Sequence, residues 1–384
     1  MTPQGNRVVP VRTLGPIRDA TSYIPTLDGW RAVAILLVLW HHLGKAVYLN
    51  GPDHYWIDSQ TRLGTIGVPI FFGLSGFLIT ALLLQEFQSR YRISLKSFYI
   101  RRCFRILPPL LVFLIALELL GLVLTRLEFV SSLLFFRNYA AAVSGGLFTF
   151  HLWSLSVEEH FYFLWPTILC VLLRRGNPLT PTVLIAVGFG VWEVIDFHFH
   201  FLHRLAPMLD TPMRTDLRLA GLIWGCAAGI IFQNVGFRGI AARYLTWPVF
   251  GLAFLLLACS QVVALRLATV WGAALIPILI FGTAAHPDWK LSTVLEWRLL
   301  RWIGRISYSL YLWQQLFLVP RWDAHPFPLI QSLPFSILLP FACAAASHAW
   351  IEQPTIRIGR RLAQRLAIKP AGLRSQTAGT VEAA

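Results

Sequence analysis

Charged residues are scarce in this chain of 384 residues: Asp, Glu, Lys and Arg make up 13% of it, whereas 56% is hydrophobic. A water-soluble domain needs enough polar side chains to cover its surface, and this composition does not supply them. The scarcity therefore argues against an ordinary soluble enzyme and predicts burial in a membrane.

Closely spaced cysteines are also absent. The five cysteines lie far apart, form no Cys-x-x-Cys pair, and four of them fall inside apolar runs. Structural disulfides and a thiolate metal site are therefore not expected, and we predict no metal site.

The chain has an excess of positive charge, with 33 basic and 18 acidic residues and a net charge of +15. In a soluble protein this excess would suggest nucleic-acid binding. Here Lys and Arg cluster between long apolar runs instead of on one face, which is typical of membrane topology. We therefore expect no nucleic-acid partner.

The apolar runs predict an all-α, polytopic membrane protein with about ten transmembrane helices, each able to cross about 30 Å of hydrocarbon. The predicted spans are residues 28–48, 64–86, 105–125, 151–173, 180–199, 216–233, 245–262, 266–285, 303–320 and 332–351. We divide the chain into an N-terminal segment (1–27), one membrane domain (28–355) and a basic, partly disordered tail (356–384). The first span carries ionisable residues and lacks a small-residue cleavage site, so we predict a retained helix and not a signal peptide.

The distribution of Lys and Arg predicts the orientation. Basic residues gather after the second, fourth, sixth and eighth spans and in the C-terminal tail, whereas the alternate connections hold fewer. All the basic connections lie on one side if both termini are cytoplasmic and the number of spans is even. We predict a multi-pass protein of the bacterial inner (cytoplasmic) membrane, with both termini cytoplasmic and lipids around it.

The first span contains ionisable side chains, which are costly in hydrocarbon and therefore indicate function. At about 100° per residue, His42 lies about 20° around the helix from Arg31, and His41 about 80° off that face. Arg31 and His42 thus share one face, about 16 Å apart along the axis. A histidine can take the proton of an alcohol during acyl transfer. The alternative is a pair of interfacial histidines beside Trp40.

The fourth span begins with the sequence HLWSLSVEEH, residues 151–160. Its adjacent carboxylates, Glu158 and Glu159, do not both ionise freely in an apolar setting. In the predicted orientation Glu158 lies at a depth comparable with His42, so the two can form a base and an orienting carboxylate. A structural hydrogen-bond network between helices is the alternative.

Arg102 and Arg105 lie on the cytoplasmic side of the third span and share a helix face. Two guanidinium groups can clamp a phosphate-bearing ligand, although a positive-inside anchor is the alternative. In the second span, Gly73 and Gly76 allow close helix packing, which we favour, or the passage of an acyl chain.

Together these segments resemble the acyltransferase 3 family of integral-membrane O-acyltransferases over nearly the whole chain. The first span is similar to the family's motif of an arginine, ten residues and a histidine, which selects Arg31 and His42. Arg102 with Arg105 matches an Arg-x-x-Arg motif, and the WSLSVEE run at 153–159 is the most specific similarity. Residues 67–77, 304–313 and 351–354 are further similarities.

The resemblance implies an acyl-CoA donor, acetyl-CoA by default, no permanently bound cofactor, and a carbohydrate, glycolipid or macrolide-like acceptor. Gln314 stands where many relatives carry histidine, which puts a catalytic role of the ninth span in doubt. His160 stands where glutamine is frequent. Some members carry a fused extracytoplasmic domain; we expect none after the tenth span, so a second transfer step would need a separate protein.

We therefore predict a membrane-bound O-acyltransferase. Arg102 and Arg105 would contact the donor's phosphates, Arg31 would guide the donor or stabilise charge, and His42, oriented by Glu158, would activate the acceptor hydroxyl or carry the acyl group. The main alternative is a transporter or flippase of lipid-linked sugars, because intramembrane Arg, His and Glu also mark substrate pathways. No inverted repeat is detected, which weighs against it. A membrane scaffold or sensor would leave these side chains without a role.

Overall fold

The computed structural model describes residues 23–47, 64–122, 125–206, 209–262, 268–320 and 326–367. Every regular element in these ranges is a helix, which confirms the all-α prediction. Residues 1–22 of the predicted N-terminal segment and residues 368–384 of the predicted tail lie outside the described ranges.

Each of the ten predicted spans overlaps one long helix. These helices are α1 (Pro25–Val47), α3 (Gly67–Arg90), α4 (Leu95–Leu119), α7 (Trp153–Arg174), α8 (Leu179–Phe199), α10 (Thr215–Gln233), α12 (Trp247–Val262), α13 (Ala268–Ala285), α15 (Arg298–Phe317) and α16 (Phe335–Ser347). A π-helical turn, His348–Glu352, joins α16 to α17 (Gln353–Ala367). Residues 356–367 of the predicted tail are therefore helical.

Shorter helices connect the long ones: η1 (Gly64–Ile66), α5 (Arg126–Leu133), α6 (Arg137–Ser144), η2 (Phe150–Leu152), α9 (Phe201–Leu205), α11 (Val235–Tyr244) and α14 (Lys290–Leu295). Of these, η2 leads directly into α7 and thereby fixes the start of the motif-bearing helix.

Four described helical segments are long and apolar enough to cross a membrane, namely 64–90, 179–199, 215–233 and 335–366. The pair Val235–Tyr244 and Trp247–Ser260, bent by 79°, would make a fifth. These segments support a membrane protein, while the count of about ten spans stays a prediction. The helices that carry the polar motifs, α1, α4, α7 and α15, are not among the four, because ionisable side chains lower their hydropathy.

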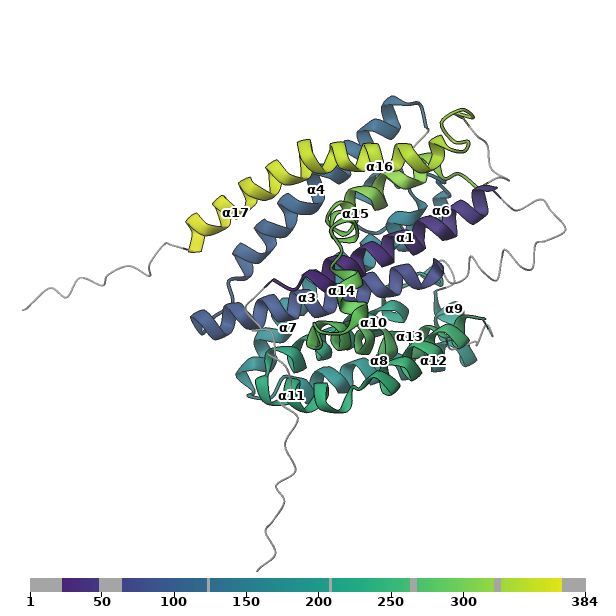
Figure 1. The fold of residues 1–384 in the computed structure, drawn as a ribbon. Coiled ribbons are helices and arrows are strands. Elements are labelled where there is room, and N and C mark those ends of the chain that lie inside the picture. Colours follow the sequence, from purple (N-terminus) through teal and green to yellow (C-terminus); the bar gives the residue numbers. More distant parts are fainter. Residues whose placement is uncertain are drawn as a thin grey trace, which may run out of the picture.

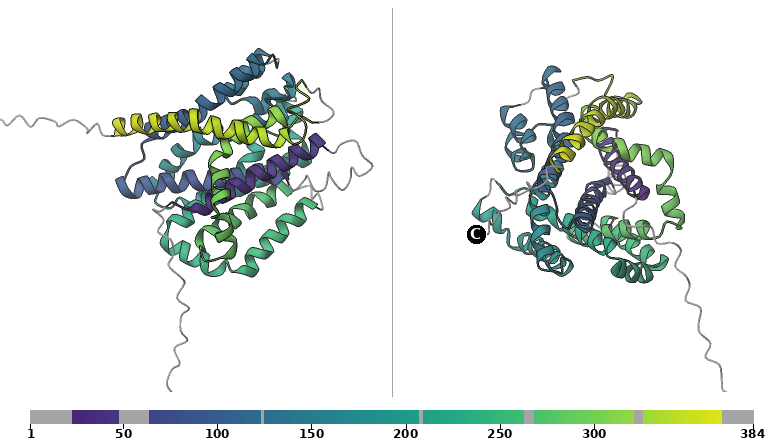
Figure 2. Two further views of the ribbon diagram at one scale, coloured as in Figure 1. Left: turned by 45° about the horizontal axis from the view of Figure 1, so that its top comes forward. Right: turned by 90° about the vertical axis from the view of Figure 1, so that its left-hand side faces the viewer.

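Helices α1 and α3 run through the middle of the bundle, with α8, α10, α12 and α13 on one side and α4, α15, α16 and α17 on the other (Figures 1 and 2). Glycines allow the closest approaches. A Cβ at Gly76 would overlap the Leu222 carbonyl oxygen of α10, and one at Gly304 would overlap the Asp28 carbonyl oxygen of α1. The packing role predicted for Gly76 is thus confirmed, and α1 is held tightly against α15.

Buried apolar side chains of α1 belong to two clusters. Leu27, Trp30 and Ala34 pack toward α13 and α3, whereas Ile35 and Val38 pack with α4 and α15. With these faces occupied by core contacts, α1 has a fixed rotation in the bundle. That rotation determines where the side chain of Arg31 points.

Candidate active site

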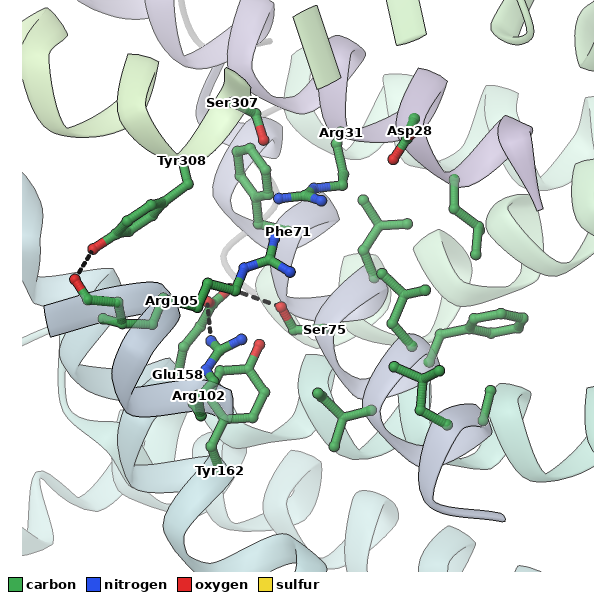
Figure 3. A pocket seen from close by; sticks show the side chains of 18 of the residues that line it. Asp28, Arg31, Phe71, Ser75, Arg102, Arg105, Glu158, Tyr162, Ser307 and Tyr308 are labelled. Atoms are coloured by element: carbon green, nitrogen blue, oxygen red, sulfur yellow. Dashed lines mark hydrogen bonds and ion pairs between the residues drawn. The ribbon is translucent and has the colours of Figure 1, made fainter. Parts of the chain in front are cut away.

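A cavity of about 330 Å³ lies among α1, α3, α4, α7 and α15 (Figure 3). Its polar lining consists of Tyr23, Asp28, Arg31, Ser75, Gln85, Arg102, Arg105, Ser154, Glu158, Tyr162, Gln233, Ser307, Tyr308 and Tyr311. Side chains such as Leu27, Leu74 and Leu78 from α1 and α3 form an apolar wall. The cavity can therefore accept a ligand with both a charged and an apolar part.

Four of the five predicted site residues line this cavity: Arg31, Arg102, Arg105 and Glu158. They come from three helices that are far apart in the sequence. The fifth, His42, is not among the described residues that line it. The structure thus joins the predicted phosphate-binding arginines to the predicted carboxylate and separates them from the histidine.

Arg102 is fully engaged by α7. Its Nε donates to Glu159 Oε1 at 3.1 Å, and its Nη2 lies 3.0 Å from the same oxygen and 3.8 Å from Glu158 Oε2. Its guanidinium carbon also lies 3.5 Å from the centre of the Tyr162 ring, a cation–π contact. Arg102 therefore ties α4 to α7 and has little capacity left for a ligand.

Arg31 and Arg105 have a different environment. Among the described residues, neither forms a hydrogen bond or an ion pair, and the two guanidinium groups lie close enough to repel each other (Figure 3). Glu352 attracts Arg105 and Glu158 attracts Arg31 only over longer distances. Two neighbouring cations without a hydrogen bond or a close ion pair are unfavourable inside an apolar bundle. An anionic ligand in the cavity would relieve both the missing hydrogen bonds and the repulsion.

Glu158 connects three helices. It accepts a hydrogen bond from Ser75 Oγ of α3 at 3.0 Å and lies 3.8 Å from Arg102 of α4. No hydrogen bond joins it to His42 in the described part of the chain, because Arg102 and Ser75 hold the carboxylate on the cavity side. The predicted orienting contact is therefore not formed in this structure.

His42 has a defined tautomer. Its Nδ1 lies 2.9 Å from the carbonyl oxygen of Val38, one turn earlier in α1. A carbonyl oxygen can only accept, so Nδ1 carries the hydrogen and Nε2 keeps its lone pair. Nε2 is therefore the atom of His42 that can act as a base or a nucleophile.

A second histidine near His42 escaped the sequence prediction. His151 in η2 is only 3% exposed, and its charge and that of His42 are close enough to interact. The hydroxyl of Tyr311 donates to the His151 carbonyl oxygen and lies 2.8 Å from Ser154 Oγ. Both Tyr311 and Ser154 line the cavity, so His151 adjoins its end. The only sequence signal was a histidine two residues before the first residue of the WSLSVEE run.

Gln314 also lies in the interior. It is fully buried in α15, and neither atom of its amide group finds a hydrogen-bond partner among the described residues. In the same part of the chain, no group of three or more His, Cys, Asp or Glu side chains could hold a metal ion.

The short helices α5 and α6 surround a buried ion cluster beside η2. Arg137 donates from Nε to Thr149 Oγ1 at 3.0 Å and from Nη2 to the carbonyl oxygens of Gly145 and Gly146. Burial raises the pKa of the Glu128 carboxyl, and the nearby Arg137 opposes this shift. The cluster holds the chain that leads into η2.

Comparison with known proteins places this geometry in context. Residues 24–350 match the family model of the acyltransferase 3 acyltransferase domain. The peptidoglycan O-acetyltransferase OatA of Listeria monocytogenes is 29% identical over 322 residues, which cover 77% of this chain and 49% of that protein. The O-acetyltransferase OatA of Staphylococcus aureus is 28% identical over 369 residues, covering 88% and 58% respectively. The chain spans about half the length of the curated relatives it matches. No solved structure matches it.

Proposed function

Because the chain belongs to the acyltransferase 3 family, we propose that it is a membrane-bound O-acyltransferase that moves an acetyl group from acetyl-CoA to a hydroxyl of a sugar or glycan. The names of the relatives, O-acetyltransferase and peptidoglycan O-acetyltransferase, support the acetyl group and a glycan acceptor. The proposal includes about ten membrane spans in a bacterial inner membrane, with both termini in the cytoplasm.

The observation that carries the proposal is the pair of guanidinium groups in the cavity that form no hydrogen bond or close ion pair with a described residue. Coenzyme A combines a diphosphate with a less polar arm that ends in the thioester. Arg31 and Arg105 can donate to the phosphate oxygens from two helices, while the apolar wall receives the arm. We assign the donor's phosphates to Arg31 and Arg105. Arg102, which the sequence paired with Arg105, supports the site through Glu159.

The cavity has a direction in the predicted topology. Tyr23, Gln85 and Gln233 lie at helix ends that this topology places at the cytoplasmic side, and Ser154 and Tyr311 lie deeper. A donor from the cytoplasm would enter at the end lined by Tyr23, Gln85 and Gln233. Its thioester would then lie near Ser154 and Tyr311. His42 and His151 would then meet the acyl group from the extracytoplasmic half.

His42 performs the chemistry in this proposal through Nε2. This atom either takes the proton of the acceptor hydroxyl or carries the acyl group for a short time. Glu158 keeps Arg102 and Ser75 in place at the bottom of the cavity. It acts on the donor side and not on the His42 ring.

The test uses membranes that contain the full chain, incubated with [14C]acetyl-CoA. We expect His42→Ala to abolish label transfer to glycans and lipids, whereas His41→Ala, about 80° off that helix face, should retain it. Mass spectrometry of glycans and lipids from cells with and without the protein should show a difference of one acetyl group. Translocation without any mass difference would identify a transporter instead, and full transfer by His42→Ala would remove His42 from the mechanism.

A further inference from the structure

The imidazole of His151 is a buried polar group beside the cavity. The residue is 3% exposed, and neither Nδ1 nor Nε2 has a hydrogen bond of normal geometry with a described residue, although the Leu312 backbone approaches the ring. Leaving a buried polar group without a hydrogen bond destabilises the folded state. Such a group calls for an explanation, and a bound hydroxyl group would provide one.

Aromatic side chains pack against the ring of His151 but form no hydrogen bonds with its nitrogens. The ring packs edge-on to Phe113, with centroids 5.8 Å apart, and lies 5.1 Å from the ring of Tyr311. The Tyr311 hydroxyl fixes the backbone by donating to the His151 carbonyl oxygen. The imidazole is thus preorganised between two aromatic rings, beside the cavity end and within electrostatic range of His42.

The chemistry proposed for His42 leaves one step without a base. When His42 Nε2 carries the acyl group, its Nδ1 is already protonated by the bond to the Val38 carbonyl, so the ring has no free lone pair. The acceptor hydroxyl must give its proton to another group. Glu158 is engaged by Ser75 and Arg102, and an arginine such as Arg137 has no lone pair to offer.

We propose that His151 is the base that takes the proton of the acceptor hydroxyl in the second half of an acyl-His42 mechanism; this inference rests on the proposed function. In the first half, His42 Nε2 attacks the thioester carbonyl, the C–S bond breaks, and the thiolate leaves and is protonated on the cytoplasmic side. In the second half, the acceptor oxygen attacks the acyl carbon, and the C–N bond breaks with its electrons returning to His42. The hydroxyl proton passes to a ring nitrogen of His151, which later releases it to water.

The experiment separates the two halves. Membranes containing the full chain are incubated with [14C]acetyl-CoA, and label is counted separately on the protein and on glycans and lipids. His151→Phe keeps the aromatic packing and removes both nitrogens, and His151→Gln keeps a polar side chain. His198→Gln is the matched control, because His198 is exposed and bonds only the Val194 carbonyl of its own helix among the described residues.

We expect both His151 variants to lower transfer to glycans and lipids by about 10²- to 10⁴-fold, the usual contribution of a general base. Label on the protein should persist or accumulate at His42, whereas His42→Ala should lose both signals. His198→Gln should behave like the wild type.

Two results would overturn the role of His151. One is transfer at the wild-type rate in either variant. The other is the loss of both signals, the label on the protein and the label on glycans and lipids, in variants that still bind coenzyme A normally. This result would indicate a structural role or a role in the first half. A fully active His42→Ala would also overturn the role of His151, because that role depends on an acyl-His42 step. A wild-type protein that labels no glycan or lipid would instead refute the proposed function itself.

Discussion

Replacing Arg105 by glutamine tests the donor site most directly, because it removes one of the two cavity guanidinium groups that form no hydrogen bond or close ion pair with a described residue. A hydrogen bond to a charged group contributes about 1.5–3 kcal/mol, and about 1.4 kcal/mol is tenfold in affinity, so the Kd for coenzyme A should rise about 10- to 100-fold. The substitution relieves repulsion with Arg31 but also removes the attraction between Arg105 and the buried Glu352, so the two effects oppose each other and the thermal stability should change little. Arg105→Lys keeps the charge but not the planar guanidinium group, so its Kd for coenzyme A should lie between those of the wild type and Arg105→Gln.

Isothermal titration of the purified full-length protein with coenzyme A measures this effect, and titration with pantetheine, which has no phosphate, isolates the charged contribution. Arg101→Gln is the matched control on the same helix, since Arg101 is exposed and lies 3.6 Å from Glu86. The reasoning is refuted if Arg105→Gln binds coenzyme A as tightly as the wild type. It is also refuted if Arg101→Gln weakens binding equally.

Two further substitutions test the supporting structure by thermal unfolding. Arg102→Gln should destabilise the protein by about 1–3 kcal/mol, because it leaves the partly buried carboxylate of Glu159 without its ion-pair partner. Adding Glu159→Gln should restore part of the loss, and an unchanged Tm in the single variant would show that the contact is dispensable. Gly146 has φ of +89°, and a Cβ there would meet the Glu128 carboxylate. Gly146→Ala should therefore lower stability by about 1–3 kcal/mol, whereas an unchanged Tm would mean that the ion cluster yields easily.

The sequence was sufficient to find the helices and four residues that line the cavity, because both depend on local information. Apolar runs locate helices, and motif spacing selects residues on one helix face. Spacing does not tell how a helix is rotated against its neighbours. Arg102 and Arg105 therefore looked equivalent in the sequence, whereas the packing of α4 turns Arg102 onto Glu159 and Tyr162 and leaves Arg105 in the cavity.

His151 shows a second limit. Before the WSLSVEE run a lone histidine carries no periodic signal, and its position at the start of a span is typical of interfacial residues. Its burial arises from contacts with Phe113 and Tyr311, which are 38 and 160 residues away in the sequence. The expected partnership of Glu158 with His42 failed to form for the same reason: similar depth in the membrane does not establish contact when another helix supplies a closer partner.

Helix α1 carries both the proposed donor-binding residue, Arg31, and the proposed reacting residue, His42. Arg31 lies in the cavity, and His42 follows eleven residues later on the same face, about 16 Å away along the axis. The helix cannot slide or turn freely, since Gly29 packs on Leu295 and Asp28 on Gly304 without room for a Cβ. A donor whose phosphates bind at Arg31 must therefore span a fixed distance to place its carbonyl carbon at Nε2 of His42. Only a ligand with a long arm between its charged group and its reactive carbonyl can satisfy both ends, and this geometry favours an acyl thioester of coenzyme A over a small acyl phosphate.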